Sequence, residues 1–396
     1  MTEQTAVLAG QRVARLREAL QDAPFDAFLA VSTANVLYAT GYRSMGGSVF
    51  GLPTIGAFVT GDRTVVAGPV ADAAPATDAA VGGIAVDDFV PYGRFYFESD
   101  RPLPLAFTPD AHRDAVEAMA AAALSAGIGS AVIGVDSAAI NPNALAQLSL
   151  ALPGARFVDA SPWALRVRAR KLPGEIALLE RAAHLAEDGV DAAISAARVG
   201  MTERELSSIV AGVIVAGGGE PKFAVSSSGP HSAFADVYPT DRPLAPGDLL
   251  RFDVGCVVGG YWSDIGRTAV VGEPDALQAS RYAAILAGED RQLADVRAGV
   301  PASTLFKAAI QEVEAGGIRP YRRQHCGHGI GADVYEPPIV NEATDTAVEA
   351  GMTFCFETPY YVVGWGGMMV EDTIVVTDDG HRRLTRTDRS LRVIAV

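Results

Sequence analysis

The sequence predicts a mixed α/β and α+β protein of two domains, an α/β domain over residues 1–166 and a duplicated α+β domain over residues 167–396. Three observations support this division. A chain of 396 residues exceeds the size at which one hydrophobic core normally keeps growing. Short apolar strands alternate with helices in the first part of the chain. The second part begins with two helices and continues mainly as strands.

The first domain shows the strand–helix alternation of an α/β sheet. Residues 12–21 and 111–126 have helical periodicity. Apolar runs that are typical of buried strands occur at residues 27–31, 57–59, 64–67 and 131–135. This alternation predicts a mixed or parallel sheet, and the domain is expected to end between residues 158 and 166.

The second domain is predicted to open with two helices. Pro173 suits the first turn of a helix over residues 175–197, whose apolar side chains recur at steps of three and four. A capping-box pattern at residues 202–205 starts the next helix, which ends near Ala216 before a run of glycines. Strands are then expected at residues 249–254, 268–271, 353–357 and 372–376.

Two segments of this second domain resemble each other. Residues 246–253 (PGDLLRFD) and 350–357 (AGMTFCFE) each combine a turn glycine, a strand, an aromatic residue and a final acid. Each is followed by further glycine and aromatic residues and by a second acid, Asp264 or Glu371. An internal duplication whose halves each supply two carboxylates to one centre explains this pattern. Two similar β-hairpins that arose by chance are the alternative.

The composition limits the partners and the location of the protein. Its formal net charge of −15 argues against nucleic acid and anionic membranes as partners, because both require a basic face. No apolar run reaches the roughly 20 residues that span a bilayer, and the first residues lack the pattern of a signal peptide. Cys256, Cys326 and Cys355 have no paired spacing, which is typical of a reducing compartment, so we expect a cytoplasmic protein.

Four acids occupy strand positions beside apolar residues: Asp253, Asp264, Glu357 and Glu371. Burying carboxylates without partners costs several kcal/mol each, and cations are the natural way to neutralise a group of them. His328 lies between the two acid pairs in a glycine-rich loop, where the backbone can approach a ligand closely. A structural loop histidine is the alternative. Four carboxylates and one imidazole suit two divalent ions about 3.5 Å apart, Mn²⁺ first and Fe²⁺, Co²⁺ or Zn²⁺ as alternatives, in a hydrolytic centre.

The motifs around these five residues resemble those of the creatinase, prolidase and aminopeptidase P family, whose catalytic domain has the duplicated pita-bread fold. The matching segments there are 247–255 (GDLLRFDVG), 262–268 (WSDIGRT), 327–331 (GHGIG), 357–359 (ETP) and 370–373 (VEDT). Earlier segments resemble the creatinase-like N-terminal domain and the two helices after it: 35–42 (NVLYATGY), 171–175 (KLPGE) and 200–205 (GMTERE). The resemblance therefore extends over nearly the whole chain.

The resemblance implies a role for each ligand. It implies that Asp253 binds one metal ion, that His328 and Glu357 bind the other, and that Asp264 and Glu371 bridge the two. Glu357 is also implied to be the catalytic proton carrier for the attacking water. Thr268 is implied to orient a ligand carboxylate, with an ordinary strand residue as the alternative.

The chain departs from the peptidase pattern at three positions near the substrate. Where peptidases of the family carry two histidines that handle the scissile amide, this chain has Asp236 and Tyr335, which we predict to be catalytic proton donors or acceptors. Where prolidases carry an arginine, it has Met369, a predicted substrate-binding residue. Loss of that arginine removes a cation that would pair with a substrate carboxylate. These replacements favour a specialised substrate, and drift within an ordinary peptidase is the alternative.

Three further residues are candidates for the site. His325, shortly before His328, is a candidate catalytic residue, and His231 is a candidate substrate-binding residue if its loop turns inward. A histidine at the cavity entrance is the alternative for His231. Arg94 lies in the aromatic run at residues 90–97 (VPYGRFYF). The resemblance implies a homodimer in which this domain reaches the partner's site, so Arg94 is a candidate substrate contact, with a packed loop as the alternative.

These observations predict a metal-dependent hydrolase that cleaves a C–N bond in a small amide, amidine or dipeptide-like substrate. A conventional Xaa-Pro dipeptidase or aminopeptidase is the nearest alternative. A lyase, in which Asp236 removes a proton from the substrate, is the second. A family member that only binds a partner is least consistent with five intact ligand positions.

Overall fold

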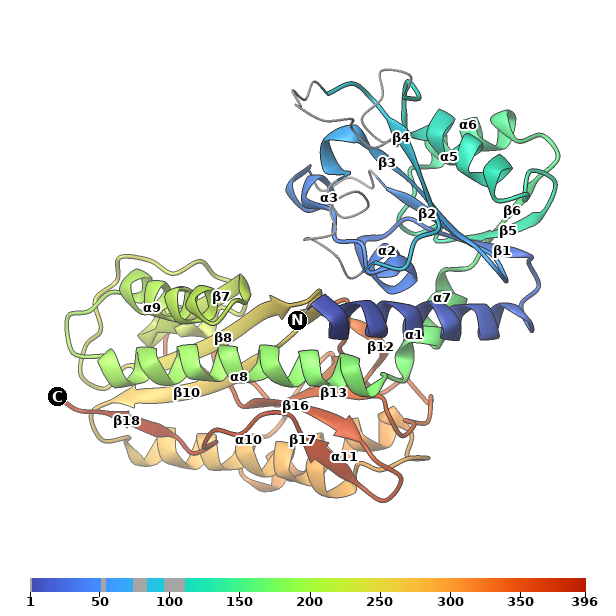
Figure 1. Ribbon diagram of the computed structural model, residues 1–396. Helices are drawn as coiled ribbons and strands as arrows, with labels where there is room; N and C mark the ends of the chain where they lie inside the picture. The colour runs from blue at the N-terminus through green and yellow to red at the C-terminus, as the bar shows by residue number, and fades with distance from the viewer. Residues whose placement is uncertain (1, 51–54, 74–83, 96–110) are drawn as a thin grey trace. The chain divides into compact units, whose positions relative to one another are not determined.

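The computed structural model describes residues 2–50, 55–73, 84–95 and 111–396, and it contains two compact units, Met1–Arg168 and Ala169–Val396 (Figure 1). The α/β character predicted for the first part of the chain and the α+β character predicted for the second are confirmed. Within the described residues, no helix is both long enough and apolar enough to cross a membrane.

The N-terminal unit is built on a six-stranded mixed sheet with the strand order β4-β3-β2-β1-β5-β6. β1 lies near the middle, where it pairs antiparallel with β2 and parallel with β5. The strands are β1 (Ala27–Ala30), β2 (Gly56–Val59), β3 (Thr64–Pro69), β4 (Asp88–Tyr92), β5 (Val132–Val135) and β6 (Arg156–Asp159).

Helices cover both faces of this sheet, because successive residues of a strand point to opposite faces. Leu29 of β1 packs in the core with α5 and α6, whereas Phe28 packs in the core with α1, α2 and α7. β1 is therefore buried throughout and reads as a continuous apolar run. The helices are α1 (Thr2–Leu20), α2 (Thr33–Thr40), α3 (Met45–Phe50), η1 (Val70–Asp72), α5 (Ala115–Ser125), α6 (Pro142–Ala151) and α7 (Ser161–Ala169).

The helix predicted over residues 111–126 is shorter in the structure. It begins at Ala115, because the Asp114 carboxylate caps it by accepting hydrogen bonds from the backbone N–H groups of Val116 and Glu117. The apolar periodicity that predicted the helix extends beyond this cap, so the sequence pattern placed the start too early.

The C-terminal unit has a ten-stranded sheet whose main path is β12-β11-β13-β16-β10-β8-β7. Neighbouring strands on this path are antiparallel, and β17, β18 and β9 pair with β16, β10 and β8. The strands are β7 (Glu220–Ser228), β8 (Leu249–Val258), β9 (Tyr261–Trp262), β10 (Ile265–Val271), β11 (Gly327–Gly329), β12 (Glu336–Ile339), β13 (Thr353–Glu357), β16 (Glu371–Val376), β17 (His381–Arg383) and β18 (Arg392–Ile394). A separate hairpin joins β14 (Tyr360–Val362) to β15 (Gly366–Met368).

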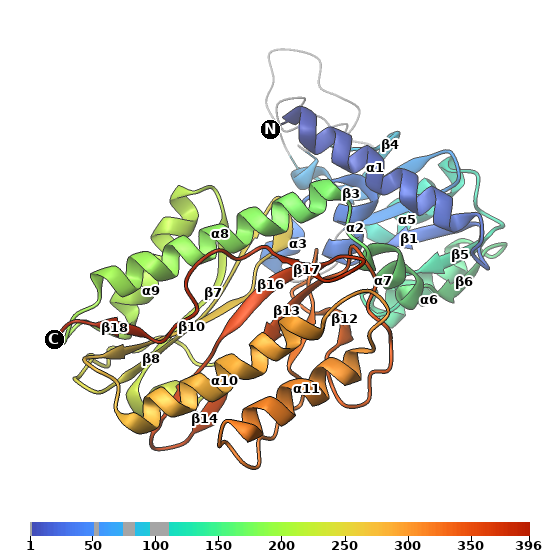
Figure 2. The same cartoon turned by 90° about the horizontal axis from the view of Figure 1, so that it is seen from below.

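The two halves of this unit repeat one arrangement, a pair of helices packed on a set of strands (Figures 1 and 2). α8 and α9 share a core with β8 and β10, and α10 and α11 share a core with β13 and β16. The halves meet where β10 pairs with β16, at Gly266 and Glu371. The helices are α8 (Pro173–Ala196), α9 (Glu203–Ala216), η3 (Gly229–Ala233), α10 (Ala276–Asp295) and α11 (Ala302–Ala315).

A buried ion pair fastens the segment before α8 to the start of β12. Nζ of Lys171 lies 2.9 Å from Oε2 of Glu336, and each side chain is only 3% exposed. Oε1 of Glu336 accepts a further hydrogen bond from the backbone N–H of Asp333 at 3.3 Å. The pair therefore fixes the loop that ends at Tyr335.

We predict that Lys171→Met destabilises the protein by about 3–5 kcal/mol, because it removes the buried charge that Lys171 sets against the Glu336 carboxylate. The double variant Lys171→Met/Glu336→Leu should recover most of this loss, since it removes both charges from the interior. Urea unfolding followed by fluorescence measures both values. A double variant as unstable as the single one would contradict the prediction.

Candidate metal centre

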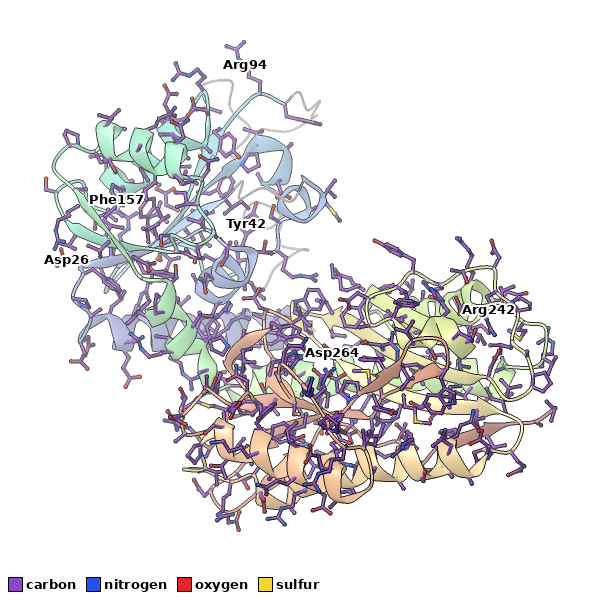
Figure 3. The ribbon with its side chains drawn as sticks, turned by 180° about the vertical axis from the view of Figure 1, so that it is seen from behind. Asp26, Tyr42, Arg94, Phe157, Arg242 and Asp264 are labelled. Atoms are coloured by element: carbon purple, nitrogen blue, oxygen red, sulfur yellow. The ribbon has the colours of Figure 1, made fainter. Side chains whose placement is uncertain are left out.

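Antiparallel register brings three of the predicted ligands into line across the C-terminal sheet. Gly266 of β10 pairs with Asp253 of β8 on one side and with Glu371 of β16 on the other. Glu371 pairs in turn with Glu357, the last residue of β13. Asp264 immediately precedes β10, and Figure 3 shows it among the strands of this unit. The four predicted carboxylates therefore come from adjacent strands.

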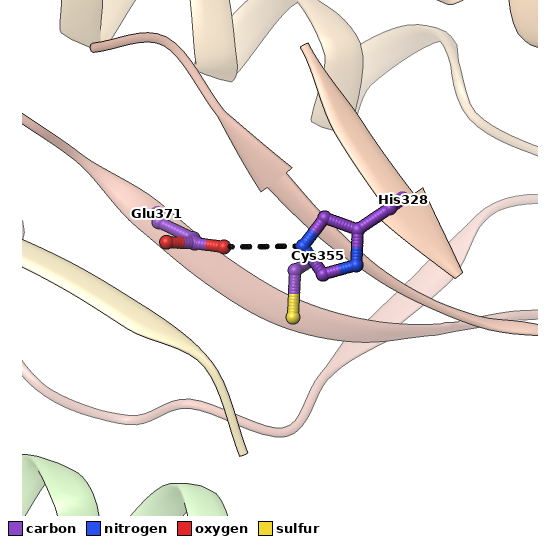
Figure 4. Close-up of side chains that lie close together, drawn as sticks. All are labelled: His328, Cys355 and Glu371. Carbon is purple, nitrogen blue, oxygen red and sulfur yellow. Dashed lines mark ion pairs between the residues drawn. The ribbon is translucent and has the colours of Figure 1, made fainter. Parts of the chain in front are cut away.

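The functional groups of four of the five predicted ligands approach one another closely. One carboxylate oxygen from each of Asp253, Asp264 and Glu371 lies within 4.8 Å of the other two. Nε2 of His328 lies 3.6 Å from Oδ2 of Asp264 and 4.0 Å from Oε1 of Glu371 (Figure 4). Nδ1 of His328 donates a hydrogen bond to the carbonyl of Gly329 at 3.0 Å. Because the carbonyl can only accept, Nδ1 carries a proton, and Nε2 is the nitrogen that faces the acids and can bind a metal ion when the ring is neutral.

The donor set fits divalent metal ions. Oδ1 of Asp264 and Oε2 of Glu371 are buried and have no hydrogen-bond partner among the described residues. A buried carboxylate oxygen without a partner is costly, and a cation satisfies it. Oxygen donors with one imidazole nitrogen match borderline-hard divalent ions. The residues present therefore suit the metal ions that the sequence predicts.

Burial and mutual repulsion raise the pKa values of three of the acids. Burial and then the charge of Asp264 raise the pKa of Asp253 from 3.8 to about 7. Burial also raises the pKa of Asp264, and the pKa of Glu371 lies well above its ordinary value because burial adds to repulsion by Asp264 and Glu357. Without a metal ion, burial and repulsion therefore shift all three groups toward their protonated forms.

Glu357 differs from the other acids. Burial alone would raise its pKa, but a hydrogen bond from His325 and the charge of Arg323 hold it below its ordinary value. Nδ1 of His325 lies 3.0 Å from Oε1 of Glu357, and Nη2 of Arg323 lies 3.6 Å from Oε2. Glu357 therefore remains ionised under conditions in which the neighbouring acids take up protons.

An ionic network lies behind the centre. The buried guanidinium of Arg267 donates to the carbonyl of Glu371 at 2.6 Å and to Oδ1 of Asp372 at 2.8 Å. Its Nη2 also lies 3.2 Å from Oε1 of Glu187 on α8. These contacts fix the start of β16 against β10, and with it the backbone of Glu371.

The centre opens into a cavity of about 830 Å³. Asp253, Asp264, Glu357 and Glu371 line it, and so do four of the predicted catalytic and substrate-binding residues: Asp236, His325, Tyr335 and Met369. Asp236 is exposed, whereas Met369 is buried in the wall. Arg94 belongs to the N-terminal unit and is exposed there (Figure 3).

The structure does not bring His231 to this cavity. Nδ1 of His231 lies 3.0 Å from both carboxylate oxygens of Glu203, the first residue of α9. Glu203 also accepts hydrogen bonds from Ser228 and Thr240. His231 is thus held by a buried acid that is distant in sequence, and its loop does not make the inward turn that would bring this candidate to the cavity.

The ring of Tyr335 stacks on the ring of His328, with 3.7 Å between the ring centroids and an angle of 16° between the planes. The side chain is nevertheless half exposed on the cavity side. Burial and the negative charges of Glu357 and Glu371 raise the pKa of Tyr335. Its phenol therefore stays neutral near pH 7 and can donate a hydrogen bond, but it cannot serve as an ionised base.

One expectation about the surroundings of the ligands was wrong. Thr268 does not orient a ligand carboxylate: its hydroxyl donates to the carbonyl of Met369 and accepts from the N–H of Met369, both at 2.8 Å. The sulfur of Met369 in turn lies 4.0 Å from Nη1 of Arg251. Both contacts join segments that are far apart in sequence.

Sequence reasoning missed three residues of the centre. Arg251 and Arg323 were not singled out, although Arg251 stands two positions before Asp253, on the same face of β8. That spacing was the available signal for Arg251. Cys355 pairs with His328 across β11 and β13, and its sulfur lies beside the His328 and Glu371 side chains (Figure 4). Burial raises the pKa of this thiol, so it is a neutral neighbour of the acids.

We predict that divalent ions stabilise the protein more as the pH rises. Because the folded-state pKa of Asp253 is raised to about 7, protons stabilise the metal-free fold at low pH, and this stabilisation is lost as the pH rises from about 4 through about 7. Metal ions replace these protons. Adding Mn²⁺ should therefore raise the unfolding temperature more at about pH 8 than at about pH 5.5. Equal shifts at both pH values would contradict the arrangement of acids.

Comparison with known proteins is consistent with this geometry. The chain is 33% identical over 227 residues to the Xaa-Pro dipeptidase of Pyrococcus furiosus, an alignment that covers 57% of this chain and 65% of that relative. The crystal structure of the prolidase from Pyrococcus horikoshii matches with a TM-score of 0.78 and 25% identity, over 96% of this chain and 99% of that one. An X-Pro aminopeptidase from Thermotoga maritima shares the fold, with a TM-score of 0.81 and 20% identity over 96% of this chain and 99% of that one.

Two family models match the chain, one after the other. Residues 12–170 match the creatinase/prolidase N-terminal domain, and residues 177–378 match metallopeptidase family M24. The second match contains all five predicted ligands, and the family is one of metal-dependent peptidases. The chain therefore belongs to metallopeptidase family M24 and carries the N-terminal domain of creatinases and prolidases.

Proposed function

We propose that this protein is a metal-dependent hydrolase that cleaves the C–N bond of a dipeptide-sized substrate. The observation that carries the proposal is the group of four carboxylates and one histidine at a cavity of about 830 Å³, a volume in the roughly 300–1,000 Å³ range of small-molecule sites. Because relatives such as the enzyme of Pyrococcus furiosus are named Xaa-Pro dipeptidases, Xaa-Pro dipeptides are the first substrates to test.

We assign the metal ligands as the sequence predicts. Asp253 would hold one divalent ion, His328 and Glu357 the other, and Asp264 and Glu371 would contact both. When bound, such ions would polarise the scissile carbonyl and make water a stronger nucleophile. Mn²⁺ is our first choice, because oxygen donors predominate, with Fe²⁺, Co²⁺ and Zn²⁺ as alternatives.

Glu357 is assigned as the proton carrier. His325 and Arg323 hold its carboxylate ionised, so that it can accept a proton from the attacking water and return it to the leaving nitrogen. His325 would keep the Glu357 carboxylate in place during this exchange. The neutral phenol of Tyr335 would donate a hydrogen bond to the substrate, and exposed Asp236 would attract a substrate ammonium group at the cavity wall.

Arg323 is assigned to the substrate carboxylate. Its side chain is 14% exposed, it lines the cavity, and its Nε is buried without a hydrogen-bond partner among the described residues. Its guanidinium lies over the ring of Tyr361, 5.8 Å from the centroid, which fixes its direction. A substrate carboxylate would supply the missing acceptor. Arg323 thereby offers a cation to the substrate that Met369 cannot.

The proposal extends to the compartment and the assembly of the protein. The buried free cysteines favour a reducing compartment, and we place the protein in the cytoplasm. We retain a homodimer as the working assembly, with Arg94 as the residue that would reach the partner's substrate. Size-exclusion chromatography with light scattering, together with kinetics of Arg94→Ala, tests both assignments.

The function is tested with a panel of Xaa-Pro dipeptides, other dipeptides and small cyclic amides, assayed with the metal-free protein and after addition of each divalent ion. We expect metal-dependent release of free amino acids from dipeptides, with one ¹⁸O atom from labelled water in the new carboxylate. Product formation without ¹⁸O would indicate a lyase instead. The absence of both metal binding and turnover would contradict any hydrolytic role.

Arg323→Met should raise KM for dipeptides by about 10- to 100-fold, because a charge-assisted contact with the substrate carboxylate is lost. The matched control is the same dipeptide with a C-terminal amide, whose KM should change little. Arg323 also keeps Glu357 ionised, and this effect acts on both substrates. The difference between the two changes in KM therefore reports on carboxylate binding alone. An equal rise in KM for acid and amide would refute the assignment.

A further inference from the structure

Arg251 is a fully buried arginine beside the metal centre that the proposed mechanism does not use. It stands on β8 two residues before Asp253, and its side chain has no solvent exposure. It is among the largest side chains that the structure buries completely. A buried guanidinium is costly unless its donors are satisfied, so its contacts indicate what it does.

The contacts of Arg251 join the metal centre to the cavity wall. Nη1 donates to Oδ2 of Asp253 at 3.0 Å. The other donors reach backbone carbonyls of one short segment: Nε donates to Ser232 at 3.3 Å, and Nη2 donates to Phe234 at 2.8 Å and to Ala235. This segment leads directly into Asp236. One guanidinium therefore holds a predicted ligand and the wall that carries Asp236.

Met369 approaches the same guanidinium from the other side. β10 runs between β8 and β16, and its Thr268 pairs with Arg251 and makes two hydrogen bonds with the backbone of Met369. Nη1 of Arg251 lies 4.0 Å from the sulfur of Met369. A longer side chain at residue 369 would thus end where the guanidinium of Arg251 now lies.

We propose that Arg251 is a positioning residue of the centre, and that its guanidinium fixes the Asp253 carboxylate and the segment 232–236 as one unit. This role needs a guanidinium group at this point in space, whichever residue of the chain supplies it. Met369→Arg should therefore replace Arg251 from the segment between β15 and β16. Lysine should not suffice, because one ammonium group cannot satisfy a carboxylate and three carbonyls that lie in different directions.

The test compares four full-length proteins: the wild type, Arg251→Met, Met369→Arg and the double variant. Hydrogen exchange and thermal unfolding are measured on metal-free protein, so that neither depends on the proposed reaction. Arg251→Met should speed amide exchange in residues 232–238 by about ten- to a hundredfold, because the carbonyls lose their donor. The double variant should recover much of this protection.

Unfolding temperatures give the sharpest criterion. Met369→Arg should lower the unfolding temperature of the wild type, because two buried guanidinium groups would repel each other, but should raise that of Arg251→Met. If Arg251→Met does not fold, folding of the double variant gives the same support. A Met369→Arg change that destabilises both backgrounds, or a double variant no better folded than Arg251→Met, overturns the proposal.

A spectroscopic measurement separates positioning from general stability. The visible absorption of Co²⁺ added to the folded proteins reports on the ligand geometry at the centre. Arg251→Met and Arg251→Lys should both change this spectrum, because Asp253 loses its support, and the double variant should return toward the wild-type spectrum. Spectra of the folded variants that all equal that of the wild type would overturn the link between Arg251 and Asp253.

Discussion

The centre depends on one electrostatic constraint, the confinement of four carboxylates at the inner wall of one cavity. Burying such groups together costs several kcal/mol per ion unless positive charge offsets it. The strands that carry them are locked by backbone hydrogen bonds, so the acids cannot relax by moving apart. Neutralisation must come from protons, metal ions or nearby guanidinium groups. The remaining features of the C-terminal unit follow from how these three are arranged.

Strand register sets the spacing of the acids. Gly266 pairs with Asp253 on one side and with Glu371 on the other, and only a residue without a side chain leaves room for both acids. A Cβ at residue 266 would lie 3.0 Å from Cβ of Glu371 and 2.5 Å from Cγ of Met369. The glycine therefore leaves the volume between the acids open. Behind it, Arg267 holds the backbone of Glu371 from the opposite side of the strand.

Guanidinium groups then give similar acids different properties. Arg323 and His325 keep Glu357 ionised, whereas Asp253 takes up protons near neutral pH although Arg251 contacts it. Separation of pKa values by environment is how one cluster can combine ion binding with proton transfer. In the proposed mechanism, Glu357 is the acid that exchanges protons. Arg251 instead acts through geometry, since its donors are all directed at protein acceptors.

Sequence alone determined the two-domain fold class, the family and the five residues that meet at the centre. All three can be predicted from local patterns, because strand periodicity and the motifs around Asp253, His328 and Glu371 each occupy only a few consecutive residues. Only the tertiary structure decided which side chains surround these five residues. The Glu203 partner of His231 and the Met369 partner of Arg251 lie on other elements, the latter separated by 118 positions. No local pattern encodes such pairs, because they arise only when strand pairing brings distant segments into contact.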